Sequence, residues 1–186
     1  MSVYDVKIEN LTELPRLEGS AIVSDCCGTL FEHGSDVLFP DVEDALRNVG
    51  CLALVSAFPD DSLMSARKEI LGAQIGINSD RPVWYKGALF TEAARQLAGL
   101  TEDIIILGDR SVADVGVAKF VLGHHGFNTL GVRVARPNLP VSIKVDHVLR
   151  PGFAVCAGIA KLAGQDERFR PRDDEGRRIA QSFIAG

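Results

Sequence analysis

The chain has 186 residues, enough for one well-buried core and too few for two. Apolar residues make up 46% and charged residues 24%, which is typical of globular proteins and argues against general disorder. The net charge of −5 carries no electrostatic footprint for nucleic acid or an anionic membrane surface, so those partner classes are not expected.

Short apolar runs predict the strands of a parallel sheet. Continuous rather than alternating apolarity is typical of strands that are covered on both faces. The three strongest runs each end in a small or acidic residue, and they span residues 21–25, 52–56 and 104–109. Weaker candidates lie at 74–77, 131–135 and 145–149.

Helical patterns occupy the segments between these runs. Apolar residues recur at helical spacing in 41–49, 60–71, 88–98, 114–122 and 152–162, and Asp60 or Asp61 can cap the second helix. This alternation predicts an α/β, doubly wound three-layer sandwich with a mainly parallel, Rossmann-like sheet. We expect one domain over 1–164. Residues 165–186 form a charged C-terminal tail, which is expected to be solvated or partly disordered because ten of the fourteen residues 165–178 are charged.

Three polar residues stand where the strong strands end: Asp25, Ser56 and Asp109. Ligands of such sheets bind at the carboxyl ends of the strands, near the point where the strand order reverses. Asp25 there suits a nucleophile that attacks phosphorus, with Gly28 allowing a close turn around an anion and Thr29 donating its hydroxyl to it. Taken alone, Asp25 fits a helix N-cap or a turn better than a nucleophile.

A second acidic segment follows the third strand. Asp109 ends the strand and Asp114 opens the next helix, so both can face the site of Asp25. Three carboxylates repel one another unless a hard cation lies among them, and oxygen ligands favour Mg²⁺. Lys86 precedes a helix and can neutralise charge shared by nucleophile and phosphoryl group, while Ser56 can bond a phosphoryl oxygen. The alternatives are a helix cap for Asp114 and a surface position for Lys86.

The order of these residues resembles the four motifs of the haloacid dehalogenase-like superfamily, and most closely its capless phosphatases, the group that includes phosphatidylglycerophosphate phosphatase-like proteins. The motifs are Asp25-x-Cys27-Gly28-Thr29-Leu30, Ser56, Lys86, and Gly108-Asp109 with Asp114. The resemblance covers about residues 20–150. It implies a Mg²⁺-dependent phosphatase with Asp25 as nucleophile, Mg²⁺ held by Asp25, Asp109 and the backbone carbonyl of Cys27 and supported by Asp114, and Ser56 and Lys86 binding the phosphoryl group.

The chain departs from this family at Cys27, where the phosphatases carry a second aspartate as general acid and base. A thiol with an ordinary pKa near 8.5 is poorly matched to that task, and general acid–base help is worth about 10²–10⁴-fold. Three outcomes follow: a slow phosphatase, an enzyme for substrates with good leaving groups, or a catalytically weakened protein that serves as a phosphoryl-ligand binding or scaffold module. Carbon–halogen hydrolysis is disfavoured by the carboxylate pair.

The spacing of the motifs leaves no room for a cap domain. An open site suits large phosphorylated substrates and permits a cap from a partner subunit, so a homo-oligomer is compatible with it. The four histidines are interpreted as surface or loop residues, and Arg136 and Arg150 as turn residues or as ligands of a distal anion. The chain shows no signal peptide, no apolar run of about 20 residues and no zinc-type cysteine spacing, so we expect a cytoplasmic protein with reduced thiols.

Overall fold

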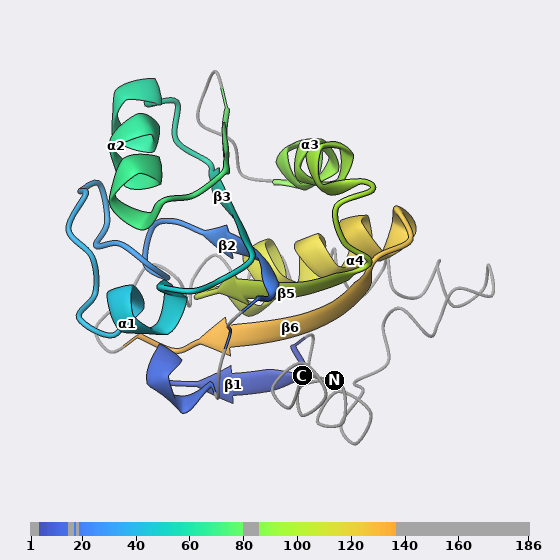
Figure 1. The fold of residues 1–186 in the computed structure, drawn as a ribbon, viewed down its shortest axis with the longest axis horizontal. Coiled ribbons are helices and arrows are strands. Elements are labelled where there is room, and N and C mark those ends of the chain that lie inside the picture. Colours follow the sequence, from blue (N-terminus) through green and yellow to red (C-terminus); the bar gives the residue numbers. More distant parts are fainter. Residues whose placement is uncertain (1–3, 15–16, 18, 80–85, 137–186) are drawn as a thin grey trace.

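The computed structural model describes residues 4–14, 17, 19–79 and 86–136 (Figure 1). Several predictions from the sequence lie outside these residues. They are the strand at 145–149, the helix at 152–162, the domain boundary after residue 164, the tail at 165–186, and the roles of His147, Arg150 and Cys156.

Six strands of the described residues form a single sheet in which every pairing is parallel. The strands are β1 (Val6–Ile8), β2 (Ala21–Asp25), β3 (Cys51–Ser56), β4 (Ile75–Asn78), β5 (Asp103–Gly108) and β6 (Asn128–Val134). Their order across the sheet is β1-β6-β5-β2-β3-β4. This arrangement confirms the predicted α/β fold with a Rossmann-like sheet.

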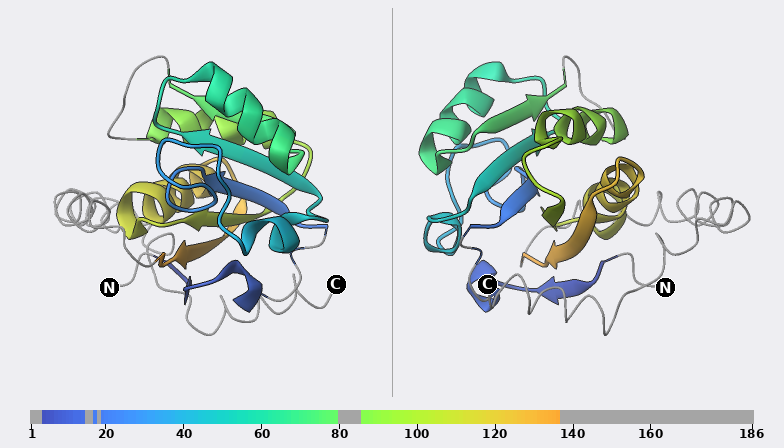
Figure 2. Two further views of the ribbon diagram at one scale, coloured as in Figure 1. Left: turned by 90° about the vertical axis from the view of Figure 1, so that its left-hand side faces the viewer. Right: turned by 45° about the vertical axis from the view of Figure 1, so that its right-hand side comes forward.

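Both faces of the sheet are buried, as the continuous apolar runs predicted. Alternate residues of β3 point to opposite sides: Leu52 and Leu54 belong to one apolar cluster, and Ala53 and Val55 to the other. The first cluster is closed by η1 (Leu11–Glu13), α1 (Val42–Leu46) and α2 (Asp61–Leu71), and the second by α3 (Gly87–Leu97) and α4 (Val117–His124). The three layers are visible in Figure 2.

Local signals set the bounds of α2. Asp60 accepts a hydrogen bond from the Leu63 N–H at 2.8 Å and is therefore the N-cap. Of the two predicted capping residues, Asp60 and Asp61, the first is confirmed. The helix ends at Gly72, whose φ of +61° is a left-handed conformation that glycine adopts without steric cost.

Two elements differ from the sequence prediction. β1 was not predicted, and it pairs with β6 at the edge of the sheet. The helix expected at 114–122 begins instead with a π-helical segment, η2 (Ser111–Gly116), which leads directly into α4. Short π-helical segments are rare and often lie at functional sites.

The strand order reverses between β2 and β5. From β2 the chain moves outward to β3 and β4, and then returns through α3 to β5 on the other side of β2. The carboxyl ends of β2 and β5 therefore flank the topological switch point, where ligands of this fold class bind. Within the part of the chain described, no helix combines the length and apolarity needed to cross a bilayer.

Candidate functional site

Three carboxylates from separate segments meet at this switch point. Asp25 is the last residue of β2, Asp109 directly follows β5, and Asp114 lies in η2. All three are buried, and each offers a carboxylate oxygen within 4.8 Å of the others. The structure thus brings together the acidic residues that the sequence predicted as a cluster.

Asp114 reaches the cluster because η2 folds back over the end of β5. A Cβ placed on Gly108 would lie 2.6 Å from the Cβ of Asp114, so only glycine permits this approach. The Val115 N–H bonds the carbonyl of Arg110, five residues back, which is the π-helical spacing. Oδ2 of Asp114 accepts the Arg110 N–H at 3.1 Å, and Oδ1 is left facing the site.

Lys86 joins two of the carboxylates. It precedes α3, is almost fully buried, and donates from Nζ to Oδ1 of Asp25 at 2.5 Å and to Oδ1 of Asp114 at 2.6 Å. A buried ammonium between two carboxylates offsets one of their charges. The lysine predicted at the site therefore lies in it, in contact with the candidate nucleophile.

Asp109 has no such partner. Within the part of the chain that the structure describes, both of its carboxylate oxygens are buried without a hydrogen-bond partner. Its neighbour Asp114 is also a carboxylate, so the two can share a hydrogen bond only when Asp109 carries a proton. A buried charge without a partner is costly, and a bound cation would remove the cost. The orphaned oxygens and the all-oxygen donor set fit a hard divalent cation such as Mg²⁺.

The pKa shifts in the cluster follow from burial and mutual charge. Burial raises the pKa of Asp25 to about 6, with Lys86 opposing the shift and Asp114 adding to it. Burial and the charges of Asp114 and Asp25 raise the pKa of Asp109 well above its ordinary range. For Asp114, burial acts upward, but Lys86, a hydrogen bond with Asp109 and the charge of Arg110 together outweigh it, and the pKa is lowered. The pKa of Lys86 is raised because Asp114 and Asp25 together outweigh its burial.

Gly28 provides the space beside Asp109. Its φ is +83°, and a Cβ there would lie 2.9 Å from Oδ2 of Asp109 and 3.1 Å from Nε2 of His33. Its N–H donates to the carbonyl of Phe31 at 2.8 Å, which closes the turn after β2. Gly28 therefore contributes the space left by its missing side chain, whereas its N–H is already bonded to Phe31.

The two predicted hydroxyl residues lie at the same edge of the sheet. Ser56 ends β3, which pairs with β2, and its buried Oγ accepts the Phe58 N–H at 3.3 Å. Thr29 is fully buried, and its Oγ1 has no hydrogen-bond partner. An unsatisfied buried hydroxyl is costly, and no described residue offsets this cost for Thr29.

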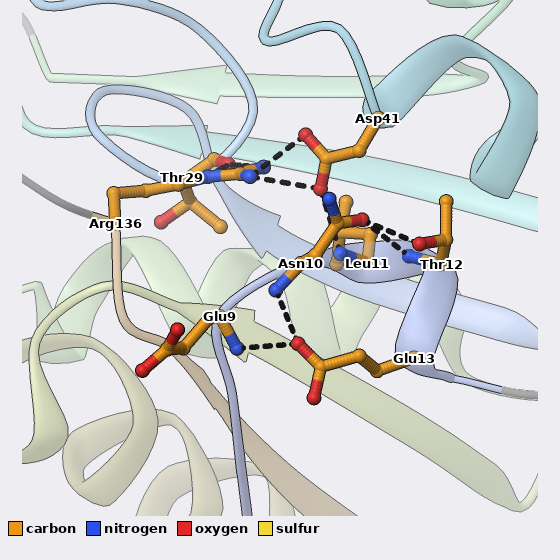
Figure 3. A network of polar contacts seen from close by, with 8 residues as sticks. All are labelled: Glu9, Asn10, Leu11, Thr12, Glu13, Thr29, Asp41 and Arg136. Carbon is orange, nitrogen blue, oxygen red and sulfur yellow. Dashed lines mark hydrogen bonds and ion pairs between the residues drawn. The ribbon is translucent and has the colours of Figure 1, made fainter.

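An ion pair fixes the backbone of Thr29 (Figure 3). Arg136 donates to both carboxylate oxygens of Asp41 at 2.7 and 2.8 Å, and to the Thr29 carbonyl from Nη2 at 2.9 Å. Asp41 also accepts the Leu11 N–H at 2.6 Å. Because its guanidinium bonds Asp41 and the Thr29 carbonyl, Arg136 holds the loop after β2 in place. These contacts do not support the predicted alternative, in which Arg136 is the ligand of a distal anion.

Cys27 is buried and belongs to the first apolar cluster. Its Sγ is 3.4 Å from Nη2 of Arg67, which donates to it and also to the Ser35 carbonyl at 2.6 Å. Arg67 is 1% exposed and lies 5.0 Å from the ring of Phe31. The described cysteines, Cys26, Cys27 and Cys51, are free thiols.

Two residues near the site were missed by the sequence prediction. Arg67 lies three residues after Met64 and four before Leu71, on the apolar face of α2, and this spacing is a signal of burial. His33 was interpreted as a surface or loop residue; it lies in an exposed loop, but its ring is beside Gly28 at the site.

The chain thus has the Rossmann-like α/β fold, with a buried acidic cluster and a lysine at the switch point of its sheet. A scan against protein-family models, a search of curated proteins and a search of solved structures each found no match. Its function is therefore inferred from its own residues.

Proposed function

We propose that this protein is a Mg²⁺-dependent phosphomonoester hydrolase that acts through an aspartyl-phosphate on Asp25. One observation carries the proposal: Asp25, Asp109 and Asp114 converge within 4.8 Å, and Asp109 has two buried oxygens without a partner. A cluster that only stabilised the fold would satisfy these oxygens internally.

The residues that would hold Mg²⁺ are Asp25, Asp109 and Asp114, with the backbone carbonyl of Cys27 added by the family resemblance. The bound ion would offset the negative charge of the site and polarise the phosphoryl oxygens. The haloacid dehalogenase-like assignment, including the absence of a cap domain, stays a prediction from the sequence motifs.

The remaining chemistry belongs to the chain. Asp25 is the nucleophile, and its position at the end of a buried central strand holds it rigidly. Lys86 already bonds Oδ1 of Asp25, so its charge is placed to stabilise the negative charge shared with the incoming phosphoryl group. Ser56 and Thr29 supply hydroxyl donors for the phosphoryl oxygens, and Thr29 has an unused one.

A second candidate is a weakened family member that binds phosphoryl ligands without efficient hydrolysis. The observation that favours it is the environment of Cys27, whose thiol is buried against Arg67. In that position it does not replace the acid/base carboxylate of the family.

Phosphate release from 4-nitrophenyl phosphate with Mg²⁺ separates the two candidates. The leading proposal requires activity in the wild type and its loss in Asp25→Asn, with Asp44→Asn on the exposed face of α1 as the matched control. Activity that is absent in the wild type and appears in Cys27→Asp supports the weakened protein instead. Wild-type activity that survives Asp25→Asn would refute the aspartyl-phosphate route.

A further inference from the structure

The loop after β2 places His33 over the site. The turn at Gly28 is followed by bridges that pair Phe31 with Cys27 and with Leu38, so the loop returns close to its own start. His33 follows this bridge, and its Nε2 would lie 3.1 Å from a Cβ placed on Gly28. An imidazole six residues after Cys27 in sequence thus lies beside the acidic cluster.

His33 and Asp109 both lie close to Gly28. Nε2 of His33 and Oδ2 of Asp109 lie 3.1 and 2.9 Å from the same point above Gly28, so they are at most about 6 Å apart, the sum of those distances. Asp109 makes no hydrogen bond with His33 in the described part of the chain. Two groups no more than about 6 Å apart are close enough to hydrogen-bond the same water molecule.

Position 27, where the haloacid dehalogenase-like phosphatases carry the aspartate that acts as general acid and base, is a cysteine in this chain. The Cys27 thiol is 7% exposed, faces Arg67 and packs in the apolar core. Water that attacks an aspartyl-phosphate must lose a proton, and a base within hydrogen-bond reach accelerates that step.

We propose that His33 is the general base that activates water for hydrolysis of the Asp25 aspartyl-phosphate, an inference that rests on the proposed function. The water oxygen bonds to phosphorus while its proton passes to Nε2 of His33. The bond between phosphorus and the Asp25 oxygen breaks, and its electron pair returns to the Asp25 carboxylate. The imidazolium then releases the proton to solvent.

The charges around His33 suit this role. Partial burial lowers the pKa of His33 below its ordinary value, and Arg110, Lys86 and Arg67 act in the same direction. Asp114 opposes them. These charges favour the neutral form of the ring, which is the form that can accept a proton.

Rapid-quench kinetics with 4-nitrophenyl phosphate and Mg²⁺ tests the proposal, because nitrophenolate release reports phosphorylation of Asp25 and phosphate release reports hydrolysis. In His33→Gln we expect an unchanged first phase, phosphate release slowed by about 10²–10⁴-fold, and phosphoenzyme accumulating in intact-protein mass spectra. His33→Ala should behave alike and recover with added imidazole. His125→Gln, an exposed histidine just after α4, is the control.

The outcomes distinguish this inference from the proposed function. Phosphorylation of Asp25 with unchanged hydrolysis in His33→Gln overturns the inference and leaves the proposed function standing. An equal loss in both phases also overturns it, because His33 would then act in binding or folding. If neither the wild type nor the variants are phosphorylated on Asp25, both fall together.

Discussion

Asp109→Asn should change the stability of the protein in opposite directions with and without Mg²⁺. Without metal, the wild type buries two carboxylate oxygens that have no partner beside two other carboxylates. An unsatisfied buried polar group costs about 1–3 kcal/mol, and more when it is charged. Asparagine removes the charge and supplies an amide donor for Asp114, so we expect the metal-free variant to be more stable by about 1–3 kcal/mol.

With Mg²⁺ the order should reverse. A ligand at about 100 times its Kd stabilises the folded state by about 2.7 kcal/mol, and the variant loses a ligand that carries negative charge. Urea unfolding at pH 7.5, once with EDTA and once with Mg²⁺, measures both effects. Asp44→Asn is the control and should match the wild type in both conditions. Equal stabilisation of the wild type and Asp109→Asn by Mg²⁺ would refute the metal site. A metal-free variant less stable than the metal-free wild type would refute the claim that the buried Asp109 carboxylate destabilises the fold.

Two further changes address the loop and its support. Asp41→Asn leaves the buried Arg136 guanidinium without its counter-ion, so we expect a loss of about 3–5 kcal/mol in urea unfolding; a loss under 1 kcal/mol would show that the pair is not tightly coupled. Gly28→Ala combines a strained φ with a clash against Asp109, whereas Gly126→Ala carries only a similar positive φ in open space. We therefore expect both to lose about 1–2 kcal/mol of stability, but only Gly28→Ala to weaken Mg²⁺ binding measured by calorimetry; equal affinities in the two variants would contradict this.

The sequence predicted the central part of the sheet because burial on both faces leaves a continuous apolar run, as in β2, β3 and β5. β1 was missed since it has only three residues at the edge of the sheet and pairs on one side alone. The π-helical start of η2 was also missed. It depends on two contacts that helical periodicity does not show, namely the close approach of Asp114 to Gly108 and the bond of Asp114 to Lys86.

The acidic cluster could be predicted because residues at the carboxyl ends of neighbouring parallel strands lie at one edge of the sheet. This rule brought Asp25, Asp109 and Asp114 together without knowledge of the strand order. The positions of His33 and Arg67 could not be predicted in the same way. The position of His33 depends on how the loop after Gly28 folds back, which is set by tertiary contacts rather than by periodicity. The spacing of Arg67 in α2 indicates burial, but it does not show that Arg67 contacts Cys27 and the Ser35 carbonyl.

The Asp41–Arg136 pair joins parts of the chain that are far apart in sequence. Arg136 follows β6, Leu11 begins η1 after β1, and the Thr29 carbonyl that Arg136 holds belongs to the loop carrying Gly28 (Figure 3). Fraying of the first strand would release Asp41 and then the loop after β2, because Asp41 and Arg136 together bond the Leu11 N–H and the Thr29 carbonyl. The ion pair therefore couples the edge strand β1 to the loop after the central strand β2. A disturbance near residue 8 would displace the backbone of residue 29 before it moved the side chains of the acidic cluster.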